Sequence, residues 1–497
     1  MGIKSTAARW FAKTEKRKIE RWANNPIQSQ AATFRYLCKN VSQTDFGKAH
    51  GVNKDTTPTE WSSLVPLVDY EDIAHWVEDI RKGKQNVLWP GKPLYFCKTS
   101  GTTSGTKYIP MTSEGLKAQT RAARSALLSY IDETGNSEFT SGKMIFLQGS
   151  PTLVKENGIG IGRLSGIVAH HVPSYLLKNR LPSWDTNCME DWEAKVDAIV
   201  DETIGKDLRL ISGIPPWVQM YFERLLAKTG KETVSEVFPN FSLFAHGGVN
   251  YEPYRPTMDN LIGKKVDSLE TYPASEGFIA FQDSQHSDGM LLNLDGGIYY
   301  EFVPVDQIHS ESPDRLSLSE VQVGVNYAIV LNTSSGLFGY VIGDTVKFTE
   351  TEPYRLVVTG RIKHFISAFG EHVIGEEVDK AMAGVCKEFG IEISEFHVAP
   401  EVNPKDGLPY HEWFIEFDGE IGAGFTKALD AKMCELNTYY ADLIEGSVLR
   451  EIVITQVPRN SFNAYMASIG KLGGQNKLPR LSNDRKIADF LTSAKVH

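Results

Sequence analysis

The stretch from Pro93 to Pro110, with the sequence PLYFCKTSGTTSGTKYIP, constrains the fold and the chemistry of this chain more than any other. Residues 94–96 are apolar and aromatic enough for a buried strand, a loop of glycine, threonine and serine follows, and ordered structure resumes at residues 108–109. Backbone N–H groups, hydroxyls and one lysine charge, placed this close together, can surround a polyphosphate. We therefore predict a phosphate-binding loop that suits ATP. Its candidate residues are Thr99, Ser100, Gly101, Thr102, Thr103 and Lys107.

This loop does not follow the Walker pattern, in which glycine, four residues and then Gly-Lys-Ser/Thr are required. Gly101 and Gly105 have three residues between them, and Lys107 is not followed by serine or threonine. The pattern therefore argues against a P-loop NTPase. Taken by itself, this window also fits a polar surface loop between two ordered elements.

The length and charge of the chain limit its class. With 497 residues, 41% of them hydrophobic, it exceeds what one hydrophobic core usually supports, so we expect two or more domains. The net charge of -10 argues against a sequence-independent nucleic-acid binder, which needs a basic surface. We expect a globular protein of enzyme size with no nucleic-acid partner, and nothing in the sequence indicates an oligomer.

The cysteines and the N-terminal residues indicate the cellular compartment of the protein. Five widely spaced cysteines without a C-x-x-C pair favour reduced thiols in the cytoplasm over disulfides or a zinc site. No run of 18 apolar residues and no apolar signal region appears, so we expect a cytoplasmic protein without a membrane partner. Residues 1–6 match the myristoylation pattern M-G-x-x-x-[ST], which six residues often meet by chance.

Residues 4–22 have the pattern of a basic amphipathic helix. They hold seven Lys/Arg against two acids, and Phe11, Ile19 and Trp22 recur at spacings that a helix places on one side. Such a helix can bind a membrane surface. We favour the alternative, a first helix whose aromatic stripe packs on the body of the protein.

Strands and helices alternate through the middle of the chain. Residues 209–212 and 241–245 read as strands, and residues 216–228 as a helix begun by proline. This alternation implies a largely parallel α/β sheet, which binds ligands at the carboxyl ends of its strands. Gly247 therefore lies at a ligand-facing end and is a candidate cofactor-binding residue. We also predict helices at residues 70–81 and 113–131, the second capped by Thr112, and a strand at residues 144–148.

Two further patterns resemble functional motifs only superficially. Residues 158–162, GIGIG, lack the third glycine of a dinucleotide-binding motif because position 165 is serine, so we predict a flexible turn. His170 and His171 could be acid/base groups or metal ligands. Because no third ligand stands at a recognisable spacing, we favour a pocket wall or a structural pair.

Two other windows carry polar residues after strands. In residues 268–277, Tyr272 could stack on a purine, the hydroxyl of Ser275 could reach a phosphate, and Glu276 could hold Mg²⁺ bound to phosphate oxygens. Asp344 follows an apolar strand and a glycine, and could accept two hydrogen bonds from a ribose diol. The alternative for each window is an ordinary strand-to-turn junction.

The C-terminal part has a different pattern. Residues 1–358 are predicted to form a large N-terminal domain, and residues 359–497 a compact α+β domain that begins at a hinge at residues 359–361. Residues 459–486 hold six basic residues and one acid. This segment either reaches toward anions or is a solvated tail.

Three segments, in this order and at these separations, resemble the nucleotide motifs of the adenylate-forming superfamily: TSGTTSGTK at residues 99–107, YPASE at 272–276 and YVIGD at 340–344. On these and supporting matches such as GQNKLPR at residues 474–480, the chain is identified as a bacterial-type member of the Gretchen Hagen family of acyl-acid amido synthetases. The family is named for auxin-responsive plant members. The likeness spans nearly the whole chain, but Gly339 stands where the family has an arginine.

The resemblance implies an α/β fold with a large N-terminal domain of mostly parallel sheets and helices, and a small α+β C-terminal domain on a hinge. It also implies a two-step ligase. A carboxylic acid attacks the α-phosphate of Mg-ATP to give acyl-AMP and pyrophosphate, and an amine, we expect an amino acid, then displaces AMP. The small domain rotates between the two steps.

The resemblance also implies roles for individual residues. The loop at residues 99–107 holds phosphates. The other implied roles are Mg²⁺ binding by Glu276, contact with adenine and the α-phosphate by Tyr272 and Ser275, ribose binding by Asp344 with Arg361, and transition-state stabilisation by Lys477. Two alternatives stay open: an acyl-CoA ligase of the same superfamily, or a non-catalytic nucleotide-binding scaffold. Retention of Glu276, Asp344 and Lys477 speaks against the scaffold.

Overall fold

The chain folds into two compact units. The computed structural model describes residues 3–100, 106–248, 250–308, 310–362, 365–366, 368, 373–402, 404–417, 419–445, 448–472 and 477–493. One unit comprises residues 1–248 and 265–357, and the other comprises residues 249–264 and 358–497. Residues 249–264 thus pack with the C-terminal part of the chain.

An eleven-stranded sheet forms the centre of the first unit, in the order β12-β13-β14-β15-β11-β10-β9-β8-β7-β3-β6. One half of it is parallel, and this half contains β3 (Lys143–Phe146), β6 (Arg180–Leu181), β7 (Leu208–Ser212), β8 (Leu243–Gly247) and β9 (Asp267–Pro273). Helices lie between these strands in sequence, as crossover connections require. The carboxyl ends of β3, β7, β8 and β9 therefore meet at one edge.

The other half of the sheet is antiparallel. It contains β10 (Phe278–Phe281), β11 (Met290–Leu292), β12 (Ile298–Pro304), β13 (Asn326–Thr333), β14 (Tyr340–Thr351) and β15 (Tyr354–Arg361). Most of its successive strands are joined by short turns and loops, which suit antiparallel pairing, and a longer loop with two short 3-10 helices joins β12 to β13. The predicted α/β class is confirmed, and the predicted parallel arrangement describes one half of the sheet.

Helices of the first unit lie between the strands of the parallel half in sequence. They are α7 (Leu164–Ala169), α8 (Ser174–Leu177), α9 (Trp184–Asn187), α10 (Trp192–Thr203), α11 (Pro215–Thr229) and α12 (Val234–Val237). Helix α11 begins with two prolines, which lack an N–H and have a preset φ that suits the first helical turn. The predicted helix at residues 216–228 therefore lies within one residue of its observed ends.

A second, four-stranded sheet has the order β2-β1-β5-β4. It contains β1 (Tyr95–Ser100), β2 (Thr106–Met111), β4 (Val154–Glu156) and β5 (Ile159–Gly162), and shares a core with α2 (Pro26–Val41), α3 (Asp45–Ala49), α4 (Pro58–Leu64) and α5 (Tyr70–Arg81). The flexible turn predicted at residues 158–162 is wrong for residues 159–162, because β5 is a fully buried strand between β1 and β4, whereas Gly158, with a φ of 82°, lies in the turn before it. Its glycines are required by packing: a Cβ on Gly160 would lie 2.7 Å from Cδ1 of Tyr95.

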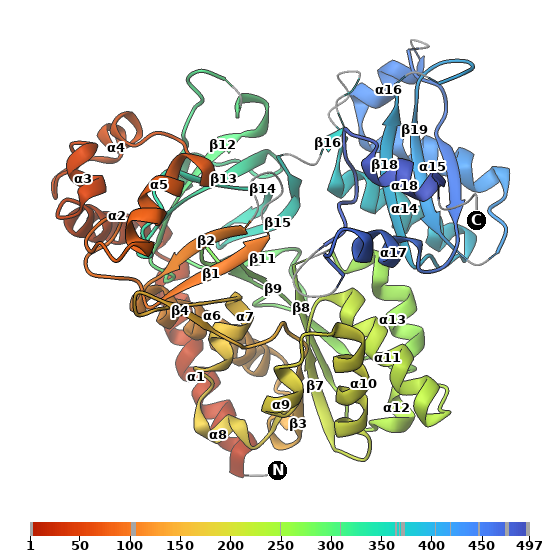
Figure 1. The fold of residues 1–497 in the computed structure, drawn as a ribbon, viewed down its shortest axis with the longest axis horizontal. Helices are drawn as coiled ribbons and strands as arrows, with labels where there is room; N and C mark the ends of the chain where they lie inside the picture. Colours follow the sequence, from red (N-terminus) through yellow and green to blue (C-terminus); the bar gives the residue numbers. More distant parts are fainter. Residues whose placement is uncertain are drawn as a thin grey trace. The chain divides into compact units, whose positions relative to one another are not determined.

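Helix α1 (Ile3–Ala23) runs beside α6 (Ser113–Thr134) in the first unit (Figure 1). Ile19 is buried and Trp22 partly buried, as predicted, but Phe11 is 55% exposed. The contact with α6 is made instead through Ala12, whose small side chain lets the two helices approach closely. Thr112 caps α6 as predicted, since its hydroxyl accepts a hydrogen bond from the N–H of Gly115.

The second unit is α+β, as predicted. Its three-stranded sheet contains β18 (Glu395–Glu401), β19 (Tyr410–Glu416) and β20 (Val453–Val457), and a two-stranded sheet pairs β16 (Phe365–Ile366) with β17 (Val373–Ile374). Its helices are α13 (Arg255–Ile262), α14 (Gly375–Phe389), α15 (Ala423–Leu436), α16 (Thr438–Glu445), α17 (Ser461–Ser468) and α18 (Lys486–Ser493). The guanidinium of Arg480 pairs with Asp379 at 3.0 Å and with Glu395, which also accepts a hydrogen bond from Tyr254. This cluster ties residues 249–264 to the second unit.

The five cysteines are free thiols. Burial raises the pKa of Cys38 to about 12 and that of Cys434 to about 11, so these thiols stay protonated near neutral pH and are poor nucleophiles. Within the described part of the chain, no helix combines the length and the apolar composition that crossing a bilayer requires.

Candidate active site

The second and third motifs meet through one hydrogen bond. The hydroxyl of Tyr272, on β9, donates to Oδ2 of Asp344, on β14, at 2.5 Å, and both side chains are buried. Strands β15, β11 and β10 lie between these two strands in the sheet order. The sheet must therefore curl to bring the two side chains together. This contact joins two motifs that are 72 residues apart in the sequence.

The turn after β9 positions Ser275 and Glu276. Ala274 and Gly277 exchange backbone hydrogen bonds of 2.9 and 3.2 Å across it. Helix α6 fixes the turn from outside, because the side-chain amide of Gln119 donates to the carbonyl oxygen of Ala274 at 2.6 Å. Ser275 is buried. The turn is therefore a rigid support for the carboxylate of Glu276.

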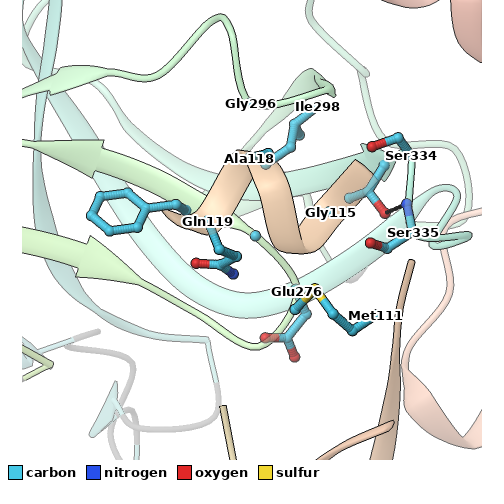
Figure 2. Close-up of a pocket in the computed structure, with 12 residues that line it drawn as sticks. Met111, Gly115, Ala118, Gln119, Glu276, Gly296, Ile298, Ser334 and Ser335 are labelled. Carbon is cyan, nitrogen blue, oxygen red and sulfur yellow. Dashed lines mark hydrogen bonds between the residues drawn. The ribbon is translucent and has the colours of Figure 1, made fainter. Parts of the chain in front are cut away.

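A cavity lies beside this turn (Figure 2). Ile298 lies on one side of it, Glu276 and Met111 on the opposite side, and Ser334 and Ser335 close a third side. The space open to the centre of a water molecule is about 10 Å³, so the cavity admits a single water. The remaining lining residues are Gly115, Ala118, Gln119, Gly277, Phe278, Gly296 and Thr333.

The cavity residues other than Glu276 were not identified from the sequence. Most are small or apolar, and such residues are common in any core. Gly115 shows why a small residue is needed: a Cβ there would lie 2.1 Å from Oγ of Ser335. The sequence offered one weak signal for these residues, namely that α6 begins directly after the strand that follows the first motif.

Gly247 ends β8, next to β9. A Cβ at this position would lie 2.1 Å from the carbonyl oxygen of Thr271, so only glycine allows the two strands to pair here. The predicted placement at the carboxyl end of a parallel strand is correct. Its part in cofactor binding remains a prediction.

The first motif connects two antiparallel strands, β1 and β2, rather than a strand and a helix. Thr99 pairs with Lys107 across this hairpin, and Nζ of Lys107 lies 5.6 Å from the centre of the Tyr70 ring. Gly101, Thr102 and Thr103 lie outside the described residues, as does the side chain of Ser100.

The strand that leads into this loop lies near the second motif. Burial raises the pKa of Cys97, on β1, and the negative charge of Glu276 acts in the same direction. Electrostatic coupling of this kind requires proximity. The structure thus brings Glu276 close to the base of the predicted phosphate loop.

Two candidate residues belong to the second unit. Arg361 ends β15, and Lys477 precedes the segment that carries Arg480. The structure therefore groups Tyr272, Ser275, Glu276 and Asp344 in one unit, with Lys107 on the neighbouring hairpin. The roles of Arg361 and Lys477 remain predictions.

Gly339 has a structural reason to be glycine. Its φ is 58°, and a Cβ there would lie 2.1 Å from the carbonyl oxygen of Pro66. Its own carbonyl accepts a hydrogen bond of 2.9 Å from Val68. The segment around Pro66 thus fills the space that an arginine would need.

We therefore expect Gly339→Arg to lower the free energy of unfolding by more than about 3 kcal/mol, since it combines a clash with a positive φ. Chemical denaturation measures this loss. Gly324→Ala is the matched control: its φ is 84°, but no atom lies within 4 Å of the added Cβ, so about 1 kcal/mol should be lost. Equal losses in the two variants would contradict the packing argument.

Three protein-family models match this chain. Those described as GH3 family N-terminal, central and C-terminal domains match residues 15–187, 291–361 and 376–486, which together make up more than half of the chain. The chain belongs to the GH3 family. The predicted Gretchen Hagen family is thereby confirmed.

Relatives match along most of the chain at low identity. The jasmonoyl-L-amino acid synthetase JAR6 of Nicotiana attenuata is 20% identical over 91% of this chain and 90% of its own length. JAR4 of the same plant is 20% identical over 64% of this chain and 66% of its own length. The indole-3-acetic acid-amido synthetase GH3.3 of Arabidopsis thaliana is 19% identical over 67% of this chain and 66% of its own length.

Solved structures show the same fold. The GH3.15 acyl acid amido synthetase has a TM-score of 0.78 at 15% identity, covering 96% of this chain and 95% of that protein. A 2-hydroxyisobutyryl-CoA ligase in the postadenylation state has a TM-score of 0.61 at 12% identity, and the match covers 94% of this chain and 91% of that protein. The fold is therefore that of adenylate-forming enzymes, with a large N-terminal and a smaller C-terminal domain.

Proposed function

We propose that this chain is an ATP-dependent acid–amino acid ligase that adenylates a carboxylic acid and transfers its acyl group to an amino acid. Its GH3 membership and its GH3 and adenylate-forming relatives confirm the ligase activity predicted from the sequence. The observation that carries the proposal for this site is the hydrogen bond between Tyr272 and Asp344, which joins two nucleotide motifs beside Glu276.

The first step is attack on phosphorus. A carboxylate oxygen of the acid attacks the α-phosphate of ATP, the bond to the β-phosphate oxygen breaks, and pyrophosphate leaves with the electron pair. Asp344, held by Tyr272, would orient the ribose, and Ser275 would contact the α-phosphate. The residues of the first motif, Thr99 to Thr103 with Lys107, would hold the other phosphates. Such fixed donors lower the barrier because they are oriented before the reaction begins.

The second step is attack on carbon. The amine nitrogen of the amino acid attacks the carbonyl carbon of acyl-AMP, the bond to the phosphate oxygen breaks, and AMP leaves. The nitrogen loses a proton as the amide forms. Lys477 would stabilise charge in the adenylation transition state, and Arg361 would support the ribose.

Mg²⁺ fits the residues present. Proteins usually hold it through one or two carboxylates together with substrate phosphates and waters. Glu276 is a donor of this kind, and the described residues contain no cluster of three or more His, Cys, Asp or Glu that could hold a metal by themselves. We therefore propose that Glu276 holds Mg²⁺ that enters with ATP, where it neutralises phosphate charge.

Three finer points are also proposals. The functional domains are residues 1–358 and 359–497, with a hinge at residues 359–361 that lets Lys477 act in the first step only. The protein works in the cytoplasm. It is a bacterial-type member of its family.

The test is ATP–pyrophosphate exchange against a panel of carboxylic acids, followed by mass spectrometry of products formed with amino acids or coenzyme A. We expect exchange and an amide product. Lys477→Ala should reduce the exchange rate by about a hundredfold or more. The matched control is Lys486→Ala, an exposed lysine of the same unit, which should keep the parental rate.

The outcomes separate the alternatives. A thioester with coenzyme A and no amide would identify an acyl-CoA ligase. ATP binding without exchange for any acid would favour the scaffold. Parental exchange in Lys477→Ala would remove the proposed role of this lysine.

A further inference from the structure

Three basic side chains gather where β3 ends: Arg163, Arg180 and Lys195. Lys195, on α10, donates to the carbonyl oxygens of Gln148 and Asn187 at 2.9 and 2.7 Å. Arg180 donates to the carbonyl oxygen of Ala169 at 3.1 Å. The side-chain amide of Gln148 forms more hydrogen bonds when its oxygen faces Arg180, and in that orientation Arg180 donates to this oxygen at 2.6 Å. We call these three residues the cationic cluster.

Arg163 completes the cluster. A Cβ on Gly149 would lie 2.9 Å from Cδ of Arg163 and 3.3 Å from Nη1, so the guanidinium lies over the loop that follows β3. Its charge also reaches Lys195. Burial lowers the pKa of Lys195 to about 8, and the positive charge of Arg163 acts in the same direction.

The cationic cluster lacks a balancing acid. Among the described residues, no carboxylate lies within ion-pair distance of Arg163, Arg180 or Lys195. Lys195 is buried and the two arginines are partly buried, and charges removed from water in this way are usually paired. Glu190, whose charge acts on Lys195, is exposed. Burial also lowers the pKa of Arg180. Three positive charges held together without an anion indicate that an anion binds there.

A second observation supports a ligand. Trp192 lies one turn before Lys195 on α10 and is buried, and its indole N–H has no acceptor within the described structure. Buried donors are nearly always paired, so an unpaired one a single helical turn from Lys195 suggests an acceptor that binds from outside the chain.

The position of the cluster relates it to the ligase site of the same unit. β3, β7, β8 and β9 are neighbours in the parallel half of the sheet. Adjacent strands lie about 4.8 Å apart, so the ends of β3 and β9 are about 14 Å from each other. The turn that carries Glu276 follows β9. An extended chain of roughly ten bonds, at about 1.2 Å per bond, spans most of this distance.

We propose that the cationic cluster binds a substrate carboxylate other than the one that is adenylated. This inference rests on the proposed function. The carboxylate has two possible sources: the far end of a dicarboxylic acyl acid, or the α-carboxylate of the amino acid. A bidentate arginine such as Arg163 or Arg180 suits either one.

The first experiment measures pyrophosphate exchange, without amino acid, for α,ω-dicarboxylates of four to ten carbons and for their monomethyl esters. The ester keeps the length and removes the second charge. If the acyl acid is the source, kcat/KM for the best diacid should exceed that for its ester by about 10- to 100-fold. Arg163→Gln and Arg180→Gln should reduce this ratio toward one.

Arg163→Gln keeps the test informative if Arg180→Gln fails to fold, because the guanidinium of Arg163 has no hydrogen bond within the described structure. Arg224→Gln is the control, since this exposed arginine on α11 pairs with Glu193 and Asp197 of α10. It should leave the diacid-to-ester ratio unchanged.

The second experiment measures amide formation with an amino acid and with its carboxamide. If the amino acid is the source, the cluster variants should raise KM for the amino acid about tenfold or more, leave exchange unchanged, and have no effect with the carboxamide. Equal kinetics of diacid and ester, together with unchanged amino-acid KM in both variants, would overturn the proposal. Absence of exchange and of amide with every acid would instead refute the proposed function.

Discussion

Glu276→Gln should lower the rate of pyrophosphate exchange by about a hundredfold or more, while the protein keeps its fold. The substitution keeps the size of the side chain and removes its charge. The turn that carries it is fixed by hydrogen bonds from Gly277 and Gln119, which do not involve the carboxylate. A loss of activity would therefore report the charge, through the contribution of a preorganised group to the transition state.

The measurement is the exchange rate at saturating ATP as Mg²⁺ is varied. If Glu276 holds the metal, Glu276→Gln should need more Mg²⁺ for half-maximal exchange than the parent. Glu114→Gln is the control: this residue lies at the start of α6, accepts a hydrogen bond from Tyr36 and is exposed, so it should not change the Mg²⁺ dependence. A parental rate with unchanged Mg²⁺ dependence would exclude the proposed role of Glu276.

Local signals in the sequence were sufficient for several helices. Tyr70–Arg81 was predicted with its observed bounds, because its apolar residues recur at helical spacing. In the structure Asp69 also caps its first turn by accepting a hydrogen bond from the N–H of Glu71. The start of α6 was predicted from its capping residue, Thr112. Where the ends of a helix are set by its own residues, the sequence contains the information.

Where distant packing decides, the sequence reading failed. The GIGIG run of residues 158–162 has the composition of a turn, yet residues 159–162 form a buried strand. Strands β1 and β4 supply hydrogen bonds on both sides, and Tyr95 and Leu153 need space without a Cβ. Phe11 has the right spacing for a buried stripe, but the close approach of α1 to α6 uses Ala12. Neither outcome follows from local spacing.

The candidate site shows the same division. The polar residues after β9 were recognised because glycine and short polar residues mark strand ends, whereas Asp344, predicted to follow a strand, lies within β14. Their mutual contact was not, since it depends on a sheet that curls across three intervening strands. The cationic cluster could not be found from sequence either, because Arg163, Arg180 and Lys195 come from a loop, a strand and a helix that are separate in the sequence.

Asp344→Asn should raise KM for ATP in the exchange reaction by about 10- to 100-fold, since a buried charge-assisted hydrogen-bond acceptor is lost. Tyr272→Phe should have a smaller effect, because it leaves the carboxylate in place and removes only the group that orients it. In the double variant the two effects should not add. Residues in direct contact act as a unit, so once Asp344 is changed, the hydroxyl of Tyr272 has little left to orient.

A matched pair in the same unit provides the control. Tyr130 donates to Oδ2 of Asp267 at 2.7 Å, and Asp267 lies at the opposite end of β9 from the candidate site. Tyr130→Phe and Asp267→Asn remove a hydrogen bond of the same kind and should affect stability alone, with KM for ATP unchanged. If the two pairs changed KM equally, the effect at Asp344 would be a general consequence of weakening β9. Additive effects of Asp344→Asn and Tyr272→Phe would show that the two motifs bind the nucleotide independently.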